Sequence, residues 1–312
     1  MHIRNDKMQR LAEIARQYYL EDRKQSDIAR EMGVSRPLIS RMLKEARDLG
    51  IVEIRVHEAG EQGRMTLNRM RTAFGLVGGV LIPDGANDSL TNRSLSEGVL
   101  DLLTETACTH VGLGWGHLIG ALVGYLEETG PVPTSIREVC PLMGNAGIPI
   151  RNYHSNENVR IFAEKTGGTP HFLYLPALAE SRQEREVLCG TEVYRQAAYA
   201  WEQMDGALVN IGNYPSTPDF ASGARFGSLL QQKKACGRLL AYYFNEAGEI
   251  IESDNDFAIQ IPIDTLSRSR CVIGLCSANT SVRALTGALR TGLFTHIVAR
   301  ETLAAECLAL QM

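Results

Sequence analysis

The segment from residue 25 to residue 47 carries basic, hydroxyl and carboxamide side chains at the spacing of an exposed helix face. Guanidinium and ammonium groups bind phosphates and guanine edges, and hydroxyl and carboxamide groups bond to other base edges. A helix beginning near residue 36 places most of these groups on its outer side. We therefore predict contacts with DNA from Gln25, Ser35, Arg36, Pro37, Ser40, Arg41, Lys44 and Arg47.

Two short helices joined by a tight turn are needed to position these side chains. The first is predicted over residues 25–32, and Gly33 provides the backbone freedom for the reversal. The Ser35 hydroxyl can cap the second helix, and Pro37 fits its first turn. The residues predicted to be inward are Ile28, Ala29, Met32, Leu38, Ile39, Met42 and Leu43. This pattern is typical of a helix-turn-helix, whose second helix enters the major groove. The alternative is a surface helical hairpin with solvated charges.

The flanking segments complete a small domain over residues 1–57. Residues 51–56 alternate apolar and polar side chains, which predicts a short strand, the wing beside the second helix. Residues 58–76 are predicted to be a linker containing a helix, roughly from Met65 to Phe74. Residues 8–20 predict a helix that covers the back of the helix pair with Leu11, Ile14, Ala15 and Tyr18.

The composition limits the class of protein. The chain has 312 residues and is 44% hydrophobic, which is enough for a small domain and one large domain. Its N-terminus does not resemble a signal peptide and no apolar run is long enough to span a membrane, so we expect a cytoplasmic protein. The seven cysteines form no CxxC pair and no zinc-ligand cluster. We expect reduced cysteines and neither a metal nor a cofactor.

The net charge of −4 is unevenly distributed. Residues 1–57 contain 12 Lys and Arg against 9 Asp and Glu, whereas residues 58–312 contain 20 against 27. A mildly basic head on an acidic body suits a protein that touches phosphates with one end only.

From residue 78 onward, short apolar runs alternate with helical stretches. Several runs are continuously apolar, as in parallel strands that helices cover on both faces. The predicted strands are 79–82, 110–114, 138–144, 171–177, 206–212, 271–276 and 296–299, and the predicted helices are 93–106, 117–129, 157–166, 192–203 and 281–291. This alternation favours an open, mostly parallel, Rossmann-like α/β domain over residues 77–312.

Glycine-rich turns follow three of the predicted strands. They are Gly112 to Gly116 with Trp115 and His117 beside it, Gly144-Asn145-Ala146-Gly147, and Gly212-Asn213. Glycines at such turns can turn backbone amides toward an anion, although they also simply allow close packing. Because parallel strands end at one edge of a sheet, three such turns predict a ligand cleft there.

The sequence resembles the SorC family of bacterial sugar-responsive transcription regulators over nearly its whole length. The motifs in the head are Tyr18-Tyr19, residues 25–29, Gly33 to Arg36, Ile39 to Leu43, Ala46 and Gly50 to Val52. Those in the body are Gly112 to Gly116, Pro141 to Gly144, Ala163 to Gly167, Asn210 to Gly212, Tyr243 to Asn245 with Gly248, and Ala288 to Leu293. The resemblance implies a winged helix-turn-helix, an effector domain like sugar-phosphate isomerases without catalysis, a sugar-phosphate effector, and dimers or tetramers.

The chain departs from this family pattern at several pocket positions. Leu118 replaces a threonine after the glycine turn, and Ser281 replaces a lysine before the last helix. Arg238 and Arg300 stand where acidic residues are usual. Either the pocket binds a different anion, such as a sugar acid or a differently placed phosphate, or the site has decayed. The predicted effector contacts are Gly112, Gly114, Trp115, Gly116, His117, Gly144, Asn145, Gly212, Asn213, Arg238, Asn279, Ser281 and Arg300.

The sequence therefore predicts a DNA-binding regulator whose operator affinity responds to a small sugar, sugar acid or sugar phosphate. Its predicted partners are operator DNA, that carbohydrate and further copies of itself, with no membrane. One alternative is a sugar-phosphate isomerase or deaminase with an appended DNA-binding domain, because fold does not determine chemistry. The histidines are dispersed, however, and no acid–base pair stands out, so we predict no catalytic residues. A scaffold that binds DNA constitutively is a third possibility.

Overall fold

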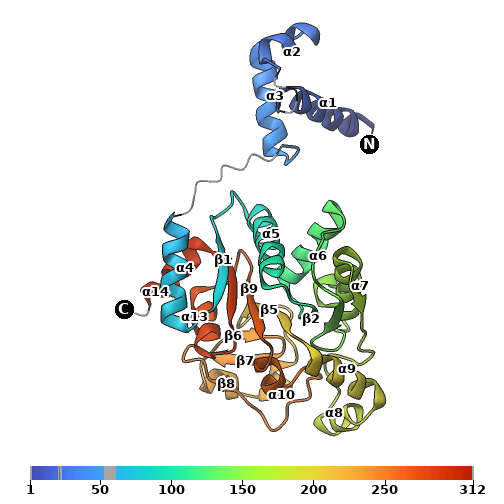
Figure 1. Ribbon diagram of the computed structural model, residues 1–312, viewed down its shortest axis with the longest axis vertical. Helices are drawn as coiled ribbons and strands as arrows, with labels where there is room; N and C mark the ends of the chain where they lie inside the picture. The colour runs from blue at the N-terminus through green and yellow to red at the C-terminus, as the bar shows by residue number, and fades with distance from the viewer. Residues whose placement is uncertain (1, 20, 22, 53–60, 311–312) are drawn as a thin grey trace. The chain divides into compact units, whose positions relative to one another are not determined.

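The structure is a computed structural model that describes residues 2–19, 21, 23–52 and 61–310. The chain divides into two compact units, Met1–Gly60 and Glu61–Met312. Their elements can be followed along the chain in Figure 1. In the described residues, no helix is long and apolar enough to cross a membrane.

The first unit consists of α1 (His2–Tyr19), α2 (Gln25–Glu31) and α3 (Arg36–Asp48). Gly33 has a φ of 64°, and the Val34 amide donates to the Ala29 carbonyl across the turn, so the predicted reversal is confirmed. The core of the unit is formed by buried residues of all three helices, namely Leu11, Ile14, Ala15, Ile28, Ala29, Ile39, Leu43 and Ala46.

Two local predictions for this unit are wrong. Ser35 stands at the N-cap position of α3, but its side chain accepts no capping hydrogen bond, and Pro37 in the first turn has no N–H to donate one. Leu38 is 37% exposed rather than part of the core, because it lies away from the Ile39–Leu43 side of the helix.

The predicted wing falls only partly within the described residues. Ile51 and Val52 form a bend, and residues 53–56 lie outside the described residues.

The second unit contains a ten-stranded sheet. Seven strands pair in parallel in the order β1-β10-β9-β5-β2-β3-β4, and an antiparallel branch of β6, β7 and β8 extends from β5. The strands are β1 (Gly78–Ile82), β2 (His110–Leu113), β3 (Glu138–Pro141), β4 (Thr169–Pro170), β5 (Gly206–Asn213), β6 (Ala235–Leu239), β7 (Tyr242–Asn245), β8 (Ile250–Ile251), β9 (Cys271–Cys276) and β10 (His296–Arg300). The predicted open, mostly parallel α/β fold is confirmed.

Helices cover both faces of this sheet. The helices are α4 (Glu61–Phe74), α5 (Asp88–Thr106), α6 (His117–Thr129), α7 (Ser155–Thr166), α8 (Arg182–Cys189), α9 (Glu192–Gln203), α10 (Ser222–Phe226), α11 (Leu229–Gln232), α12 (Ile263–Ser267), α13 (Val282–Arg290) and α14 (Glu301–Ala309), with a short 3-10 turn at Arg151–Tyr153. One core lies under α5, α6 and α7, and the other joins α4, α9, α13 and α14 to the opposite face (Figure 1).

The predicted linker helix belongs to the second unit. α4 begins at Glu61 rather than near Met65, and Met70 on its inner face is completely buried. α4 packs against β1 and α14. The apolar residues of this segment therefore contribute to the core of the second unit instead of forming a free connection.

The predicted strand at 171–177 is also wrong. Parallel pairing with β3 stops after Pro170, and the chain continues without regular structure. The side chain of Asn156 takes the place of a neighbouring strand, because its Oδ1 accepts from the Leu173 amide and its Nδ2 donates to the Leu173 carbonyl. Several apolar residues of this segment are thus buried although the segment forms no β-strand.

Close packing explains one of the predicted pocket glycines and can be tested. A Cβ on Gly112 would lie 2.1 Å from Met204 Sδ and 2.4 Å from Leu142 Cδ2, whereas one on Gly147 would meet nothing within 4 Å. We expect Gly112→Ala to lower the free energy of unfolding by about 1–3 kcal/mol and Gly147→Ala to change it by less than about 0.5 kcal/mol. Urea unfolding followed by tryptophan fluorescence reports on this unit, since both tryptophans lie in it. Equal stability of the two variants would contradict the packing.

Candidate DNA-binding face and effector pocket

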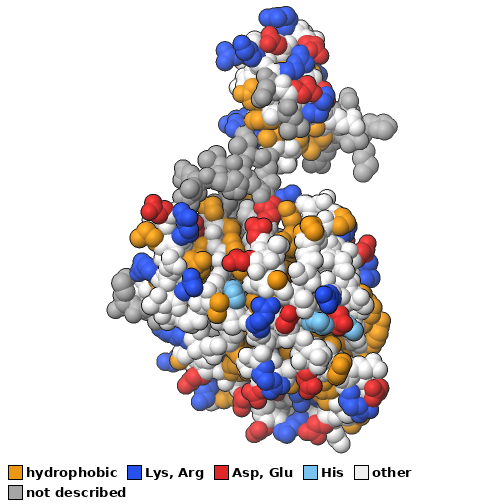
Figure 2. All heavy atoms as spheres, in the orientation of Figure 1, with side chains coloured by type: hydrophobic (Ala, Val, Ile, Leu, Met, Phe, Trp, Pro, Cys, Tyr) orange, Lys and Arg blue, Asp and Glu red, His pale blue; other side chains and the backbone are white. Residues whose placement is uncertain are grey.

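The outer face of α3 presents basic side chains that form no ion pair with any described residue. Ser35, Ser40 and Pro37 are exposed, and only Gln25 of the predicted DNA contacts is partly buried. The four cations of this face form no ion pair with other described residues and are Arg36, Arg41, Lys44 and Arg47. Figure 2 shows Lys and Arg side chains gathered on the surface of this unit.

Several cations elsewhere in the first unit are paired with carboxylates. Arg16 lies 2.8 Å from Glu13, Arg30 lies 3.5 Å from Asp27, and Lys7 pairs with Glu45. The ion pairs thus leave the α3 cations free for an external anion. The exposed Leu38 lies on the same helix and adds an apolar group that can contact a thymine methyl.

The second candidate site is a pocket at the carboxyl ends of β2, β5 and β9. The chain winds outward in one direction through β2, β3 and β4 and in the other through β5, β9 and β10. The reversal lies between β5 and β2, which is where open α/β sheets bind ligands. The pocket encloses about 490 Å³, including its open mouth.

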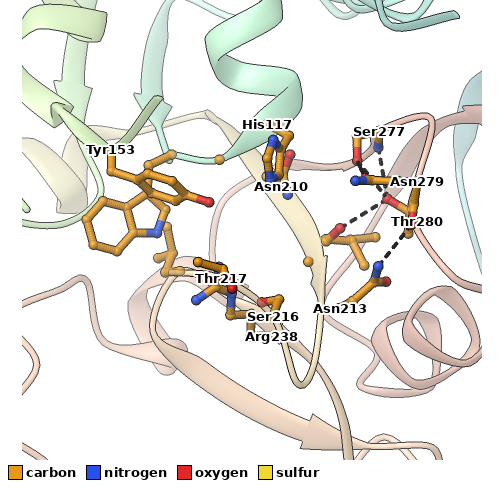
Figure 3. Close-up of a pocket in the computed structure, with 15 residues that line it drawn as sticks. His117, Tyr153, Asn210, Asn213, Ser216, Thr217, Arg238, Ser277, Asn279 and Thr280 are labelled. Atoms are coloured by element: carbon orange, nitrogen blue, oxygen red, sulfur yellow. Dashed lines mark hydrogen bonds between the residues drawn. The ribbon is translucent and has the colours of Figure 1, made fainter. Parts of the chain in front are cut away.

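Its lining is polar at two ends and aromatic along one side. Figure 3 shows Arg238 with Ser216 and Thr217 at one end, and Asn213, Asn279 and Thr280 at the other. The residues that line it are Trp115, Gly116, His117, Tyr153, Asn210, Ile211, Gly212, Asn213, Ser216, Thr217, Arg238, Leu240, Ser277, Asn279 and Thr280.

Strand pairing brings Arg238 into the pocket. β6 runs antiparallel to the end of β5, with Arg238 opposite Gly212. A Cβ on Gly212 would come within 3.3 Å of both Arg238 Cγ and Nε, so the glycine leaves room for the arginine side chain. The guanidinium carbon lies 4.4 Å from the centre of the Phe220 ring, and Nη1 donates to the Pro218 carbonyl at 3.0 Å.

Arg238 is a buried cation without a carboxylate partner. It is 7% exposed and forms no ion pair in the described part of the chain. Burial lowers its pKa below the ordinary value, with Tyr153, Tyr243 and the Asp219 carboxylate acting in the opposite direction. Burial also raises the pKa of both tyrosines, so they stay neutral and do not compensate the charge.

The other deeply buried arginine is neutralised. Arg225 is 1% exposed and lies 2.9 Å from Asp256 Oδ1; it also donates to the Phe220 and Ala241 carbonyls. Among the described residues, the fold thus contains one deeply buried guanidinium with a carboxylate at ion-pair distance and one, Arg238, that borders the pocket and has the Asp219 carboxylate only at longer range.

Trp115 supports this arrangement rather than presenting a free face. Its ring stacks on Phe220 with centroids 4.6 Å apart and 16° between planes, and Tyr153 packs on its edge. Trp115, Phe220 and the Arg238 guanidinium therefore form one stack. This stack fixes the position of the charge.

Five backbone amides at two of the predicted glycine turns donate within the protein and are not available to an anion. Helix α6 is capped from within, because its start meets the Asn210 side chain. The backbone N–H groups donate as follows: Gly114 to the Leu208 carbonyl (2.9 Å), Gly116 to the Asn152 carbonyl (3.1 Å), Leu118 to Asn210 Oδ1 (3.0 Å), Gly144 to the Ile259 carbonyl (3.0 Å) and Asn145 to the Leu175 carbonyl (3.0 Å). Internal hydrogen bonds and close packing therefore explain the glycines at positions 114, 116 and 144.

Six of the predicted effector residues do not line the pocket. Arg300 is bound by Asp84 at the end of β10, and Ser281 caps α13 by accepting from the Ala284 amide. Gly112 and Gly114 pack inside the sheet, and a Cβ on Gly144 would strike the Pro176 carbonyl. The Asn145 side chain accepts from the Asn156 amide. The pocket does bring together Trp115, Gly116, His117, Gly212, Asn213, Arg238 and Asn279.

Asn213 orders the far wall of the pocket. Its Nδ2 donates to the Asn279 carbonyl at 2.9 Å, and its Oδ1 accepts from the Ser281 amide at 2.9 Å. The Ser277 hydroxyl donates to Asn279 Oδ1 at 2.6 Å. Ser216 Oγ is buried and has no hydrogen-bond partner among the described residues. The wall is thus a set of ordered hydroxyl and carboxamide groups suited to a polyhydroxyl ligand.

The sequence missed several lining residues, which are Tyr153, Asn210, Ser216, Thr217, Ser277 and Thr280. Ser277 could have been found, since it directly follows the buried strand β9, whereas Asn210 lies within β5. No spacing marks Tyr153 or Ser216, because they come from irregular segments.

The lining contains no carboxylate, and the described residues contain no cluster of His, Cys, Asp and Glu that could hold a metal ion. His117 is the one histidine of the lining and has no acidic partner in the described residues. The pocket is therefore equipped to bind and orient a ligand, and it offers no acid–base pair for turnover.

Comparisons with known proteins agree with this division of the chain. The family model described as “Putative sugar-binding domain” matches residues 64–309. The sorbitol operon regulator of Klebsiella pneumoniae is 25% identical over 297 residues, which cover 91% of this chain and 93% of the relative. The deoxyribonucleoside regulator of Bacillus subtilis is 26% identical over 306 residues, covering 94% and 95%.

A solved structure has the same fold. The crystal structure of the full-length sorbitol operon regulator from Klebsiella pneumoniae matches with a TM-score of 0.71 and 23% identity, covering 96% of this chain and 98% of that one. The relatives are named as regulators, which gives no support to the enzyme alternative.

The two buried arginines should respond oppositely to neutralisation. We expect Arg225→Gln to lower the free energy of unfolding by about 3 kcal/mol, because it leaves Asp256 without its counter-ion. Arg238→Gln should change it by less than about 1 kcal/mol, since the lost contacts are offset by removal of an uncompensated buried charge. Urea unfolding without ligand measures both values. If Arg238→Gln lowered the free energy of unfolding as much as Arg225→Gln does, Arg238 would stabilise the fold even without a ligand, which would contradict this expectation.

Proposed function

Because this chain belongs to the SorC family of transcription regulators, we propose that its first unit binds operator DNA and that a small carbohydrate in the pocket of its second unit sets the operator affinity. The observation that carries the proposal is the pairing, in one chain, of an uncompensated basic α3 face with a polar pocket at the sheet's carboxyl edge. The α3 face supplies a surface that can bind DNA, and the pocket supplies a site that can sense a ligand.

The α3 face divides into two kinds of contact. Arg36, Ser40 and Arg41 stand in the first half of the helix, where helix-turn-helix proteins read base edges. Lys44 and Arg47 stand further along and are placed to contact phosphates. Unpaired cations cost less to bring to DNA than paired ones, because no internal salt bridge must be broken first.

The pocket suits a polyhydroxyl ligand. Its hydroxyl and carboxamide groups can exchange hydrogen bonds with several hydroxyls, and its lining has a single full charge. A regulator also needs the ligand to favour one of two states, since a ligand that binds both equally shifts nothing. A coupling of about 1–3 kcal/mol changes DNA affinity roughly 5- to 150-fold.

Recognition by one helix-turn-helix is weak, so the protein is proposed to act as a homo-oligomer, at least a dimer, on a two-fold operator. One such unit offers a small interface, and specific binding normally uses two units on half-sites separated by whole helical turns.

The proposed function is tested on DNA recovered by the full chain from a random oligonucleotide pool. Fluorescence anisotropy measures the affinity for the selected fragment in the presence of each member of a library of sugars, sugar acids and sugar phosphates. At least one compound should change the dissociation constant 5-fold or more. Tight, specific DNA binding that no compound alters would instead support a constitutive DNA-binding scaffold.

Substitutions on α3 should separate base reading from phosphate contact. We expect Arg41→Ala to cost about 1–3 kcal/mol on the selected fragment and to relax the preference at one base pair. Lys44→Ala should weaken binding to all fragments alike and flatten the salt dependence by about one unit of slope. Anisotropy titrations at several salt concentrations provide both measurements, and unchanged affinity in both variants would take α3 out of the groove. Arg30→Ala, at a cation paired with Asp27, is the control.

The assembly state is tested by light scattering at micromolar concentration together with DNA titration. We expect a mass of at least two chains and a selected site with two related halves. A monomer that binds a single half-site tightly would refute the proposed oligomer.

A further inference from the structure

The charge balance of the pocket limits the charge of its ligand. Arg238 is the one Lys or Arg of the lining, and no Asp or Glu lies beside it there. The cations predicted to assist it are absent from the pocket, because Arg300 is paired with Asp84 and position 281 is a serine that caps α13. The lining therefore carries one full positive charge.

The backbone adds little to this charge. A helix N-terminus attracts anions through its free amides, but the first turn of α6 uses the Leu118 amide on Asn210 Oδ1. At the start of α13, the Ser281 amide donates to Asn213 and the Ala284 amide to Ser281. A helix N-terminus carries only about half an elementary charge, so neither terminus equals a second cation.

One buried cation matches one negative charge. A phosphate monoester carries about −1.5 to −2 charges at neutral pH and would leave part of its charge uncompensated in a half-enclosed site. A carboxylate carries one charge, and its two oxygens fit the parallel N–H groups of a guanidinium. Nη1 donates to the Pro218 carbonyl, and the hydroxyls of Tyr153 and Tyr243 lie close enough to interact with the guanidinium.

The fold treats its other buried arginine in this same way. Arg225 lies against Asp256, a carboxylate, at 2.9 Å. Arg238 is 7% exposed against 1% for Arg225, and it has a similar aromatic support, Phe220 in place of Phe226 and Tyr243. It forms no close ion pair with a described residue, and the Asp219 carboxylate acts on it only from a longer distance. A carboxylate on the ligand would give Arg238 the close partner that Arg225 has in Asp256.

We propose that the effector is a sugar acid, an aldonate or uronate of five or six carbons, whose single carboxylate binds Arg238 and whose hydroxyls face the wall of Asn210, Ser277 and Asn279. The proposal rests on the proposed function for the location of the sensor and adds the chemical class of the effector. Ser216 Oγ, which is buried without a partner next to Arg238, donates to the same carboxylate.

The test uses the full chain and matched compounds. Isothermal titration and thermal unfolding are measured with the five- and six-carbon aldonates and uronates. The corresponding alditols and aldoses serve as neutral analogues, and the aldose 6-phosphates and 5-phosphates as esters. We expect at least one acid to bind with a dissociation constant below 1 mM and at least 30-fold more tightly than its neutral and phosphorylated analogues. Quenching or enhancement of tryptophan fluorescence should accompany binding, because Trp115 stacks on the Phe220 ring that supports Arg238.

Three variants assign the effect to Arg238. Arg238→Gln should weaken acid binding at least 30-fold without changing the affinity for DNA, and Arg238→Lys should retain a weaker response because it keeps the charge without the fork. Arg300→Gln, at the arginine paired with Asp84, should bind the acid like the wild type. Circular dichroism checks that each variant is folded; if Arg238→Gln is not, Arg238→Lys against the full set of analogues decides.

Several results would overturn the inference. They are tighter binding of a phosphate ester or a neutral sugar than of every acid, unchanged acid binding in Arg238→Gln, and no binding by any acid. These are distinct from failure of the proposed function. A phosphate or neutral sugar that shifts DNA affinity overturns the sugar acid but keeps the regulator, whereas DNA binding that no compound alters overturns the sensor itself.

Discussion

The length of β5 is the constraint on which the pocket depends. β5 pairs in parallel with β2 on one side and β9 on the other, and it continues through Gly212 and Asn213 after both parallel ladders have ended. The free end pairs antiparallel with β6, which brings Arg238 opposite Gly212. Asn213 on the same extension holds the loop after β9. Gly212 and Asn213, the two residues of β5 beyond the parallel ladders, thus position Arg238 at one end of the pocket and the carboxamide groups at the other.

An uncompensated buried charge is costly, and the fold reduces that cost without cancelling it. The Arg238 guanidinium stacks on Phe220, which stacks on Trp115, and one of its nitrogens donates to the Pro218 carbonyl. These contacts orient the cation but supply no negative charge. An anion that enters the pocket gains both the preformed geometry and the relief of the buried charge, which favours tight and selective binding.

Contacts among described elements continue from the pocket through α13 and α14 to α4, the helix that follows residues 53–60 in the chain. That continuity gives coupling a physical route, and only measurement shows whether coupling uses it.

Patterns of apolar residues predicted the architecture well, because burial repeats along every helix and strand. The strand at 271–276 and the helices at 117–129 and 192–203 have the predicted bounds. The segment at 171–177 has an equally apolar pattern, yet the Asn156 side chain replaces its partner strand, and no local signal reports such a contact. The branch of β6 to β8 was likewise beyond prediction, since its short strands carry no period that separates them from loops.

The pocket was predictable in position but not in chemistry. Glycine turns at strand ends identified the correct edge of the sheet, whereas the bonds of Gly116 and Gly144 show packing and not anion binding. Arg238 and Arg300 looked alike in the sequence as basic residues near strand ends. Asp84 distinguishes them, because it lies far from Arg300 in the chain and neutralises it in space. Exposure and pairing, which require the fold, decide which arginine is available to a ligand.

The central claim, that one chain couples a carbohydrate pocket to operator binding, is tested most directly by thermodynamic linkage. The measurement compares the operator affinity of the full chain with and without saturating ligand, and the ligand affinity with and without saturating operator, in one buffer. The account predicts that both ratios are equal and lie between about 5 and 150, because coupling between two sites is reciprocal. Ratios of 1 in both directions, with DNA and ligand each binding tightly, would contradict it.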